Sequence, residues 1–120
     1  MNLAAQVLAA FVAFEHFGFM VLEAYFWNKP LGLKIFRRTQ AEADSSFALA
    51  KNQGLYNGFL AAGLVWGLVA EPAIGVPVRL FFLGCVVVAG IVGAITVSPR
   101  IFVVQGAPAL VGLAVTWMGR

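Results

Sequence analysis

Two acids and a histidine interrupt the first hydrophobic stretch of this chain. Glu15 and His16 are adjacent, and Glu23 follows about two helical turns later, inside a segment at 2–27 that is otherwise mostly apolar. Inserting an ionisable side chain near the centre of a membrane helix costs roughly 2.5–3.5 kcal/mol, so such groups usually face a bundle interior or a water-filled cavity. These three residues are therefore the first candidates for ligand binding, proton transfer or acid–base catalysis.

Further polar side chains open the second hydrophobic stretch and recur in the last one. In the run Asn-Gln-Gly-Leu-Tyr-Asn-Gly at 52–58, residues four apart share a helix face, so Gln53 aligns with Asn57 and Asn52 with Tyr56. Their amides and phenol can donate hydrogen bonds to a carboxylate. The predicted site consists of Glu15, His16, Glu23, Asn52, Gln53, Tyr56, Asn57 and Gln105.

Composition indicates that these side chains are positioned by an integral membrane domain that covers residues 1–120. Hydrophobic residues make up 62% of the chain and the mean hydropathy is +0.92, far above the values of soluble domains. A spanning helix needs about 20 mostly apolar residues, so the chain has room for four. They are predicted at about 2–27, 53–70, 76–97 and 101–118. Short links make neighbouring helices antiparallel, which predicts an all-α, four-helix up-down bundle.

The connector between the first two spans has an ordinary soluble composition. Trp27 suits an anchor at the membrane interface, and the run at 29–32 should end the first helix. Thr39, followed three residues later by Glu42, is a capping-box pattern and predicts a short amphipathic helix at about 40–51. The basic entrance to this helix could contact anionic lipid headgroups, but a solvated connector is the simpler interpretation and the one we prefer.

The positions of the cations predict the orientation. Six of the eight lysines and arginines lie in the first connector or at Arg100, which leaves only Arg79 and Arg120 on the other side. The positive-inside rule then places residues 28–52 in the cytoplasm and both termini outside. Glu15 would lie near the bilayer centre after about 18 Å of helix, with the other site residues in the cytoplasmic half. Topology explains the net charge of +3, so no nucleic-acid partner is expected.

Three interpretations of the polar set remain open. The first is an integral membrane protein that binds, and in an assembly transports, a small or lipophilic ligand, with Glu15 as the charge or proton carrier. The second is a membrane-embedded acid–base enzyme of the isomerase or hydratase type, with Glu15 and His16 as the candidate catalytic residues. The third is polar glue between helices, worth about 0.6 kcal/mol per hydrogen bond. We favour the first, because amides would join helices without the cost of a charge.

No metal or other cofactor is predicted. Transition-metal sites draw several histidine, cysteine or carboxylate ligands into one shell, and this chain has a single histidine. Haem would need His16 from two copies or a second ligand such as Met20. The sequence also lacks a glycine-rich phosphate loop and a nucleophile elbow. Cys85, the only cysteine, is expected to be a buried structural thiol.

Small residues at four-residue spacing predict close helix contacts. Gly63 with Gly67, and Ala89 with Gly93, form small-xxx-small faces that pack helices in membranes. Such faces could serve the fold of one chain or join copies in a homo-oligomer, and the spacing does not distinguish these uses.

The chain resembles a family of small four-span membrane proteins. The resemblance rests on Glu15-His16, on the motif at 52–63 and on Phe-Val-Val-Gln-Gly at 102–106, and it covers essentially the whole chain. The family is one of the domains of unknown function, number thirteen-oh-four. The resemblance implies an integral membrane protein of bacterial type, hence an inner-membrane location, and places the recurring polar positions on the eight predicted site residues. It implies no particular activity.

Overall fold

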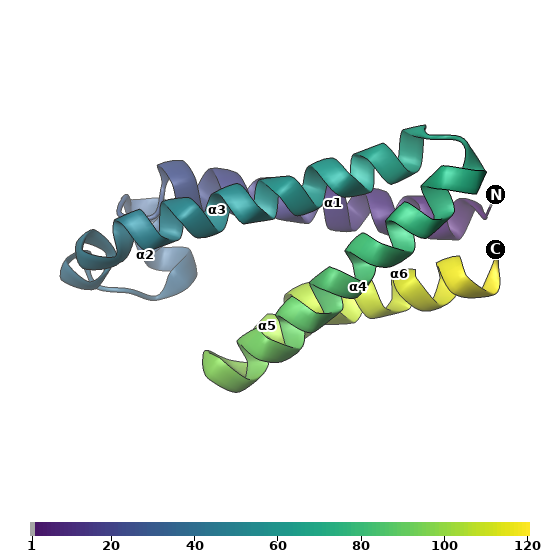
Figure 1. The fold of residues 1–120 in the computed structure, drawn as a ribbon. Coiled ribbons are helices and arrows are strands. Elements are labelled where there is room, and N and C mark those ends of the chain that lie inside the picture. Colours follow the sequence, from purple (N-terminus) through teal and green to yellow (C-terminus); the bar gives the residue numbers. More distant parts are fainter. Residues whose placement is uncertain (1) are drawn as a thin grey trace. The chain divides into compact units, whose positions relative to one another are not determined.

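Helices make up almost all of the structure. The computed structural model describes residues 2–120, and none of these residues belongs to a strand (Figure 1). The all-α fold class predicted from the sequence is therefore confirmed. The elements in chain order are α1 (Leu3–Tyr25), α2 (Pro30–Phe36), α3 (Gln40–Val69), α4 (Pro72–Thr96), α5 (Pro99–Ile101), the π-helical turn η1 (Phe102–Gly106) and α6 (Ala107–Met118).

The helices divide into two compact units. Unit 1 comprises the described part of Met1–Glu15 together with Leu60–Arg120, and unit 2 comprises His16–Phe59. Two helices, α1 and α3, each contribute one part to either unit. The boundary on α1 falls between the adjacent residues Glu15 and His16.

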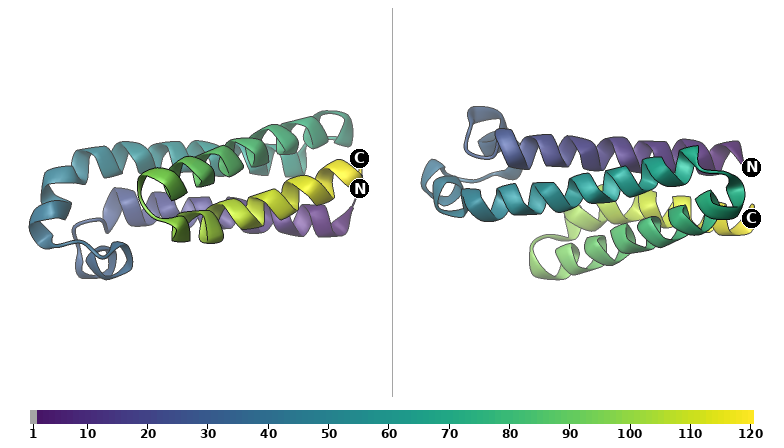
Figure 2. Two further views of the ribbon diagram at one scale, coloured as in Figure 1. Left: turned by 90° about the horizontal axis from the view of Figure 1, so that it is seen from below. Right: turned by 45° about the horizontal axis from the view of Figure 1, so that its top comes forward.

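The core of unit 1 is apolar and built on small side chains. Its fully buried residues come from α1, α3, α4 and α6, and α4 packs along η1 and α6 (Figure 2). They are Val12, Ala13, Leu64, Leu83, Val86 and Ala109. Where α4 meets η1, Gly90 and Gly106 approach so closely that a Cβ on Gly90 would lie 2.7 Å from the Gly106 Cα. The absence of side chains at both positions is what allows this contact.

The small-residue face predicted on the second span packs inside unit 1. A Cβ on Gly63 would lie 2.4 Å from the Phe82 ring, and a Cβ on Gly67 would lie 2.5 Å from the Arg79 Cγ. Both glycines therefore admit a large side chain of α4 close to the α3 backbone. Their role in joining copies of the chain stays a prediction.

Three helical stretches are long and apolar enough to cross a membrane. They are Leu3–Tyr25, Pro72–Thr96 and Pro99–Met118. Phe81 and Ile95 of α4 are among the many large apolar side chains exposed on the surface, as expected of helices that face lipid. The second predicted span, in the later part of α3, is less apolar because Asn52, Gln53 and Asn57 lie in or beside it. The structure thus supports a helical membrane protein.

The connector differs from the prediction in its helix boundaries. The short helix expected at 40–51 and the second predicted span form one 30-residue helix, α3. Residues 51–54 contain no proline, and Gly54, the one weak helix former, packs its bare backbone against Met20 of α1. The helix therefore continues without a break. The predicted capping box is confirmed, since the Thr39 N–H donates to the Glu42 carboxylate over 2.9 Å and the Glu42 N–H donates to Thr39 Oγ1 over 3.1 Å.

The last predicted span contains a π-helical turn that the sequence analysis did not anticipate. Pro108 has no N–H to donate to the carbonyl four residues earlier, and its ring crowds that carbonyl. The Ala107 N–H accordingly reaches back five residues to the Phe102 carbonyl. This widened turn, η1, carries Gln105.

Unit 2 contains a small core of its own around Trp27. The indole is 8% exposed, donates from Nε1 to Ser46 Oγ over 3.1 Å, and lies 4.8 Å from the Phe36 ring. Ala43 and Ala50 complete the buried part of this core. Trp27 is the centre of a packed cluster, which fixes α2 against α3, and its role as an interfacial anchor stays a prediction.

Candidate functional site

Glu15 is the predicted site residue with the least satisfied environment. It lies on α1 in unit 1, half-buried, and its Oε1 is buried without a hydrogen-bond partner among the described residues. A buried carboxylate oxygen without a partner is costly, because water has been removed and nothing replaces it. Such an atom is suited to accept a hydrogen bond from a bound molecule or to carry a proton.

Gln105 also belongs to unit 1, on the π-helical turn η1. It is half-buried, and the buried Gly106 follows it. Single π-turns within α-helices occur often at functional sites, because they redirect side chains and loosen carbonyl pairing. The position of Gln105 on such a turn supports its candidacy as a ligand contact.

Arg79 of α4 is a buried polar residue that the sequence analysis did not select for the site. At 1% exposed, it has the largest fully buried side chain among the described residues. Arg79 follows the start of α4 by seven residues, which is about 10 Å of helix and too deep for a rim position. That count, together with Gly67, which makes room for the Arg79 stem, was the signal that sequence reasoning missed.

Thr116 of α6 is a second buried polar residue that the sequence analysis missed. It is 3% exposed, and its Oγ1 has no hydrogen-bond partner among the described residues. It shares the buried face of α6 with Ala109 and Gly112. A lone threonine on an apolar helix carries no sequence signal that would have separated it from lipid-facing positions.

A hydrogen bond joins Glu23 and Asn57, both of them predicted site residues. In unit 2, the Asn57 amide on α3 donates to Glu23 Oε1 on α1. Gly54 and Gly58, close to Asn57 on α3, allow the two helices to approach, since a Cβ on Gly58 would lie 2.6 Å from the Met20 sulfur. The pair therefore acts as a short polar link between two closely packed helices.

The other predicted residues of unit 2 have different environments. His16 is fully buried, with its ring edge-on to Phe19 at 5.2 Å. Asn52, Gln53 and Tyr56 are exposed on α3, and no hydrogen bond connects their side chains to the Glu23–Asn57 pair among the described residues. The alignment of Gln53 with Asn57 on one helix face thus does not bring both amides to the same carboxylate.

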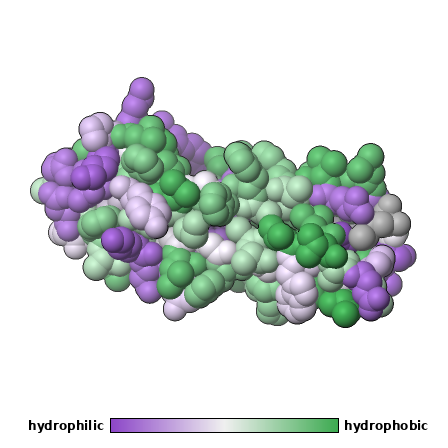
Figure 3. Space-filling model, turned by 90° about the horizontal axis from the view of Figure 1, so that it is seen from above, coloured by the Kyte–Doolittle hydropathy of each residue, from purple (hydrophilic) through white to green (hydrophobic). Residues whose placement is uncertain are grey.

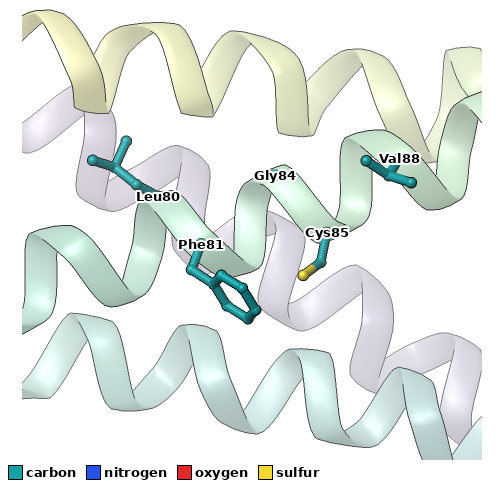
Figure 4. Close-up of a pocket in the computed structure, with 5 residues that line it drawn as sticks. All are labelled: Leu80, Phe81, Gly84, Cys85 and Val88. Carbon is teal, nitrogen blue, oxygen red and sulfur yellow. The ribbon is translucent and has the colours of Figure 1, made fainter.

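A shallow groove on α4 is apolar and separate from the predicted residues. It is lined by Leu80, Phe81, Gly84, Cys85 and Val88, all from one helix (Figure 4). None of the eight predicted site residues lines it. Cys85 is partly exposed in this groove, whereas we expected a buried thiol.

The fold and the buried polar groups define a helical membrane protein. The chain belongs to the family described as protein of unknown function (DUF1304), whose sequence profile matches residues 10–117. It is also 30% identical over 115 residues to the uncharacterized protein YpaA of Lactococcus lactis subsp. lactis (strain IL1403), an alignment that covers 94% of this chain and 96% of that protein. No solved structure is significantly similar to the chain. The family resemblance inferred from the sequence is therefore confirmed.

Proposed function

We propose that the protein binds a small, lipophilic molecule through Glu15, and that the ligand carries a hydroxyl or amine that donates to this carboxyl group. One observation carries the proposal: the Oε1 of Glu15 is buried without a hydrogen-bond partner among the described residues. Within a membrane segment, an unsatisfied carboxylate oxygen is expensive unless something pairs with it. A ligand that supplies the missing donor removes this cost on binding.

The protonation state of Glu15 depends on the ligand. A cationic amine would pair with the ionised carboxylate, whereas a hydroxyl would be held by a protonated carboxyl that both donates and accepts. Glu15 is thus the charge or proton carrier of the proposed site. Gln105, which belongs to unit 1 like Glu15, would orient the ligand from η1.

The proposed membrane topology has four spans, with both termini outside and residues 28–52 in the cytoplasm. The 30 residues of α3 extend for about 45 Å, longer than a hydrocarbon core of about 30 Å. The apolar part of α3 can therefore cross the bilayer while its polar first turns stay outside. The cations of the first connector favour the cytoplasm for that end. Transport would require two or more copies, because four helices enclose little volume.

A structural role is favoured for Glu23 and Asn57, in contrast to Glu15. The Glu23 carboxylate already has a donor in the Asn57 amide, so this pair meets the description of polar glue. We therefore separate the two acids of α1, with Glu15 assigned to ligand binding and Glu23 to helix association.

Native mass spectrometry of the protein released from lipid nanodiscs tests this separation. We expect the wild type to carry a small-molecule adduct, Glu15→Gln to lose it, and Glu23→Gln to keep it while unfolding at a lower temperature. Glu23→Gln is a matched control, since it makes the same change on the same helix. An empty wild type, or an adduct retained by Glu15→Gln, would contradict the proposal. The enzyme alternative would instead convert the recovered ligand to a product with the wild type but not with Glu15→Gln.

A further inference from the structure

The short helix α2 presents apolar side chains on two opposite faces. Leu33 and Phe36 pack into the Trp27 core, and Gly32 is buried beside them. On the other side, Leu31 and Ile35 are 48% and 43% exposed, one helical turn apart. With 3.6 residues per turn, Leu31, Lys34 and Ile35 fall within an arc of about 100°. In a connector surrounded by water, exposing Leu31 and Ile35 in this way is unfavourable, because apolar surface is more stable out of water.

One cation, Lys34, lies on this outer face, and Lys29 and Arg37 cap the two ends of α2. The side chains of Lys29, Lys34 and Arg37 are exposed, and none of them lies over an aromatic ring in the described part of the chain. Arg38, by contrast, lies over the Trp27 ring, with its guanidinium carbon 5.0 Å from the ring centre. The α2 end of unit 2, at the left of Figure 3, accordingly shows hydrophilic and hydrophobic surface side by side.

The helix α2 packs closely against the end of α1. A Cβ on Gly32 would lie 1.9 Å from the Phe26 carbonyl oxygen, so α2 sits directly on the residue that follows α1. Only residues 26–29 separate the two helices, a reach of at most about 14 Å. Tyr25 and Phe26 are exposed at this end of α1, as aromatic residues at a membrane interface are.

The backbone of Arg37 adds an independent observation. Arg37 ends α2 in the left-handed conformation, with φ 55°, and it is the one described non-glycine residue with a positive φ. Glycine adopts this conformation without the steric cost that a side chain meets. A charged residue at this position indicates that its side chain has a use outside the helix cap.

We propose that the outer face of α2 is a binding surface for anionic lipid headgroups. Leu31 and Ile35 enter the boundary between headgroups and acyl chains, while Lys29, Lys34 and Arg37 contact lipid phosphates. An apolar strip rimmed by lysine and arginine is how a helix lies in the plane of a membrane interface. This surface is independent of the ligand site at Glu15. For α2 we therefore prefer a lipid-binding connector to the solvated one that the sequence favoured.

Spin labelling of the reconstituted full-length protein tests the surface. Labels are placed singly at Leu31→Cys and Ile35→Cys in a Cys85→Ser background, with Ala41→Cys, exposed in the first turn of α3, as the aqueous control. Vesicles contain phosphatidylcholine with or without phosphatidylglycerol. Collisions with oxygen and with a water-soluble nickel chelate report depth. We expect labels 31 and 35 to collide more often with oxygen than with the nickel chelate, and to lie deeper when phosphatidylglycerol is present. Label 41 should stay accessible to the nickel chelate in both kinds of vesicle.

Charge variants show whether the anionic headgroup is the partner. Lys34→Gln/Arg37→Gln should abolish the response of label 31 to phosphatidylglycerol, whereas Arg100→Gln/Arg120→Gln, with the same loss of charge elsewhere, should keep it. The proposal would be overturned if labels 31 and 35 were as accessible to the nickel chelate as label 41. The same result is expected if the partner of this surface is a soluble protein. If labels 31 and 35 are buried to the same depth with and without phosphatidylglycerol, the preference for anionic headgroups would be overturned.

Discussion

The Asn57 amide on α3 donates a hydrogen bond to the Glu23 carboxylate on α1, at a point where glycines bring the two helices together. The link is interhelical and partly buried. It accounts for one of the two acids in the first hydrophobic stretch without requiring a ligand. The other acid, Glu15, has a buried oxygen that no described residue satisfies. This contrast within one helix leads to the first two predictions.

Breaking the Glu23–Asn57 link should destabilise the protein. Asn57→Ala leaves a half-buried carboxylate without its donor, which should cost about 1 kcal/mol and lower the unfolding temperature in detergent. Glu23→Gln in the same chain removes the stranded charge and should recover part of the loss. A double-mutant cycle measures the coupling, expected at roughly 0.6–1.7 kcal/mol. Strictly additive effects of the two changes would show that the hydrogen bond is not energetically significant.

Replacing Glu15 by an apolar residue should leave the fold intact. Because Glu15 Oε1 has no described partner, Glu15→Leu removes an unsatisfied polar group and should raise the unfolding temperature or leave it unchanged. The same variant should lose the small-molecule adduct proposed for the wild type. Thermal unfolding and native mass spectrometry of one preparation measure both effects. A large loss of stability would mean that Glu15 belongs to the polar glue.

A methyl group at Gly67 should disturb the packing of the buried Arg79. The added Cβ would lie 2.5 Å from the Arg79 Cγ, so we expect Gly67→Ala to cost about 1–3 kcal/mol through overpacking. Gly84→Ala is the matched control, since nothing lies within 4 Å of its Cβ and alanine is the better helix former. Unfolding temperatures should fall for the first variant and hold or rise for the second. Equal behaviour of both would contradict the close approach of α3 and α4 at Gly67.

The start of α3 should be sensitive to acid through Glu42. The Thr39 N–H donates to the Glu42 carboxylate and holds the pKa of this carboxyl below its ordinary value of 4.5. A lowered pKa stabilises the folded state above the ordinary value, and the contribution is lost as the pH falls through the folded pKa. The protection factors of the Thr39 and Glu42 amides, which are their exchange rates corrected for the intrinsic pH dependence, should therefore fall on acidification in the wild type. Glu42→Gln should show no such step, and a step of equal size in that variant would refute the assignment.

Relief of the left-handed backbone at Arg37 should stabilise unit 2. Glycine avoids the steric cost of φ 55°, so Arg37→Gly should gain about 1 kcal/mol in stability. The gain is expected together with a weaker response of α2 to phosphatidylglycerol, because a phosphate contact is lost. Thermal unfolding measures the first effect and a spin label at position 31 the second. A variant that is no more stable than the wild type would argue against a strained cap.

Much of this structure could be predicted from local sequence patterns. Apolar segments of sufficient length predicted a helical membrane protein, because a membrane helix satisfies its own backbone hydrogen bonds. The Thr39–Glu42 spacing predicted a helix start, since both partners of a capping box lie within one turn. Acids in an apolar helix identified Glu15 and Glu23 as unusual. Each of these inferences depends on residues that are close in the chain.

The tertiary structure decided which polar groups have partners and which side chains are buried. Glu23 and Asn57 are 34 residues apart, and only the packing of α1 on α3 in unit 2 selects this pair over Gln53 or Tyr56. The burial of Arg79 depends on Gly67 of α3, and that of Trp27 on the folding back of α2. Such contacts were not predictable from spacing alone. The sequence of a membrane protein determines which segments form helices. Which residues of two helices come into contact depends on how side chains of different size fit between them.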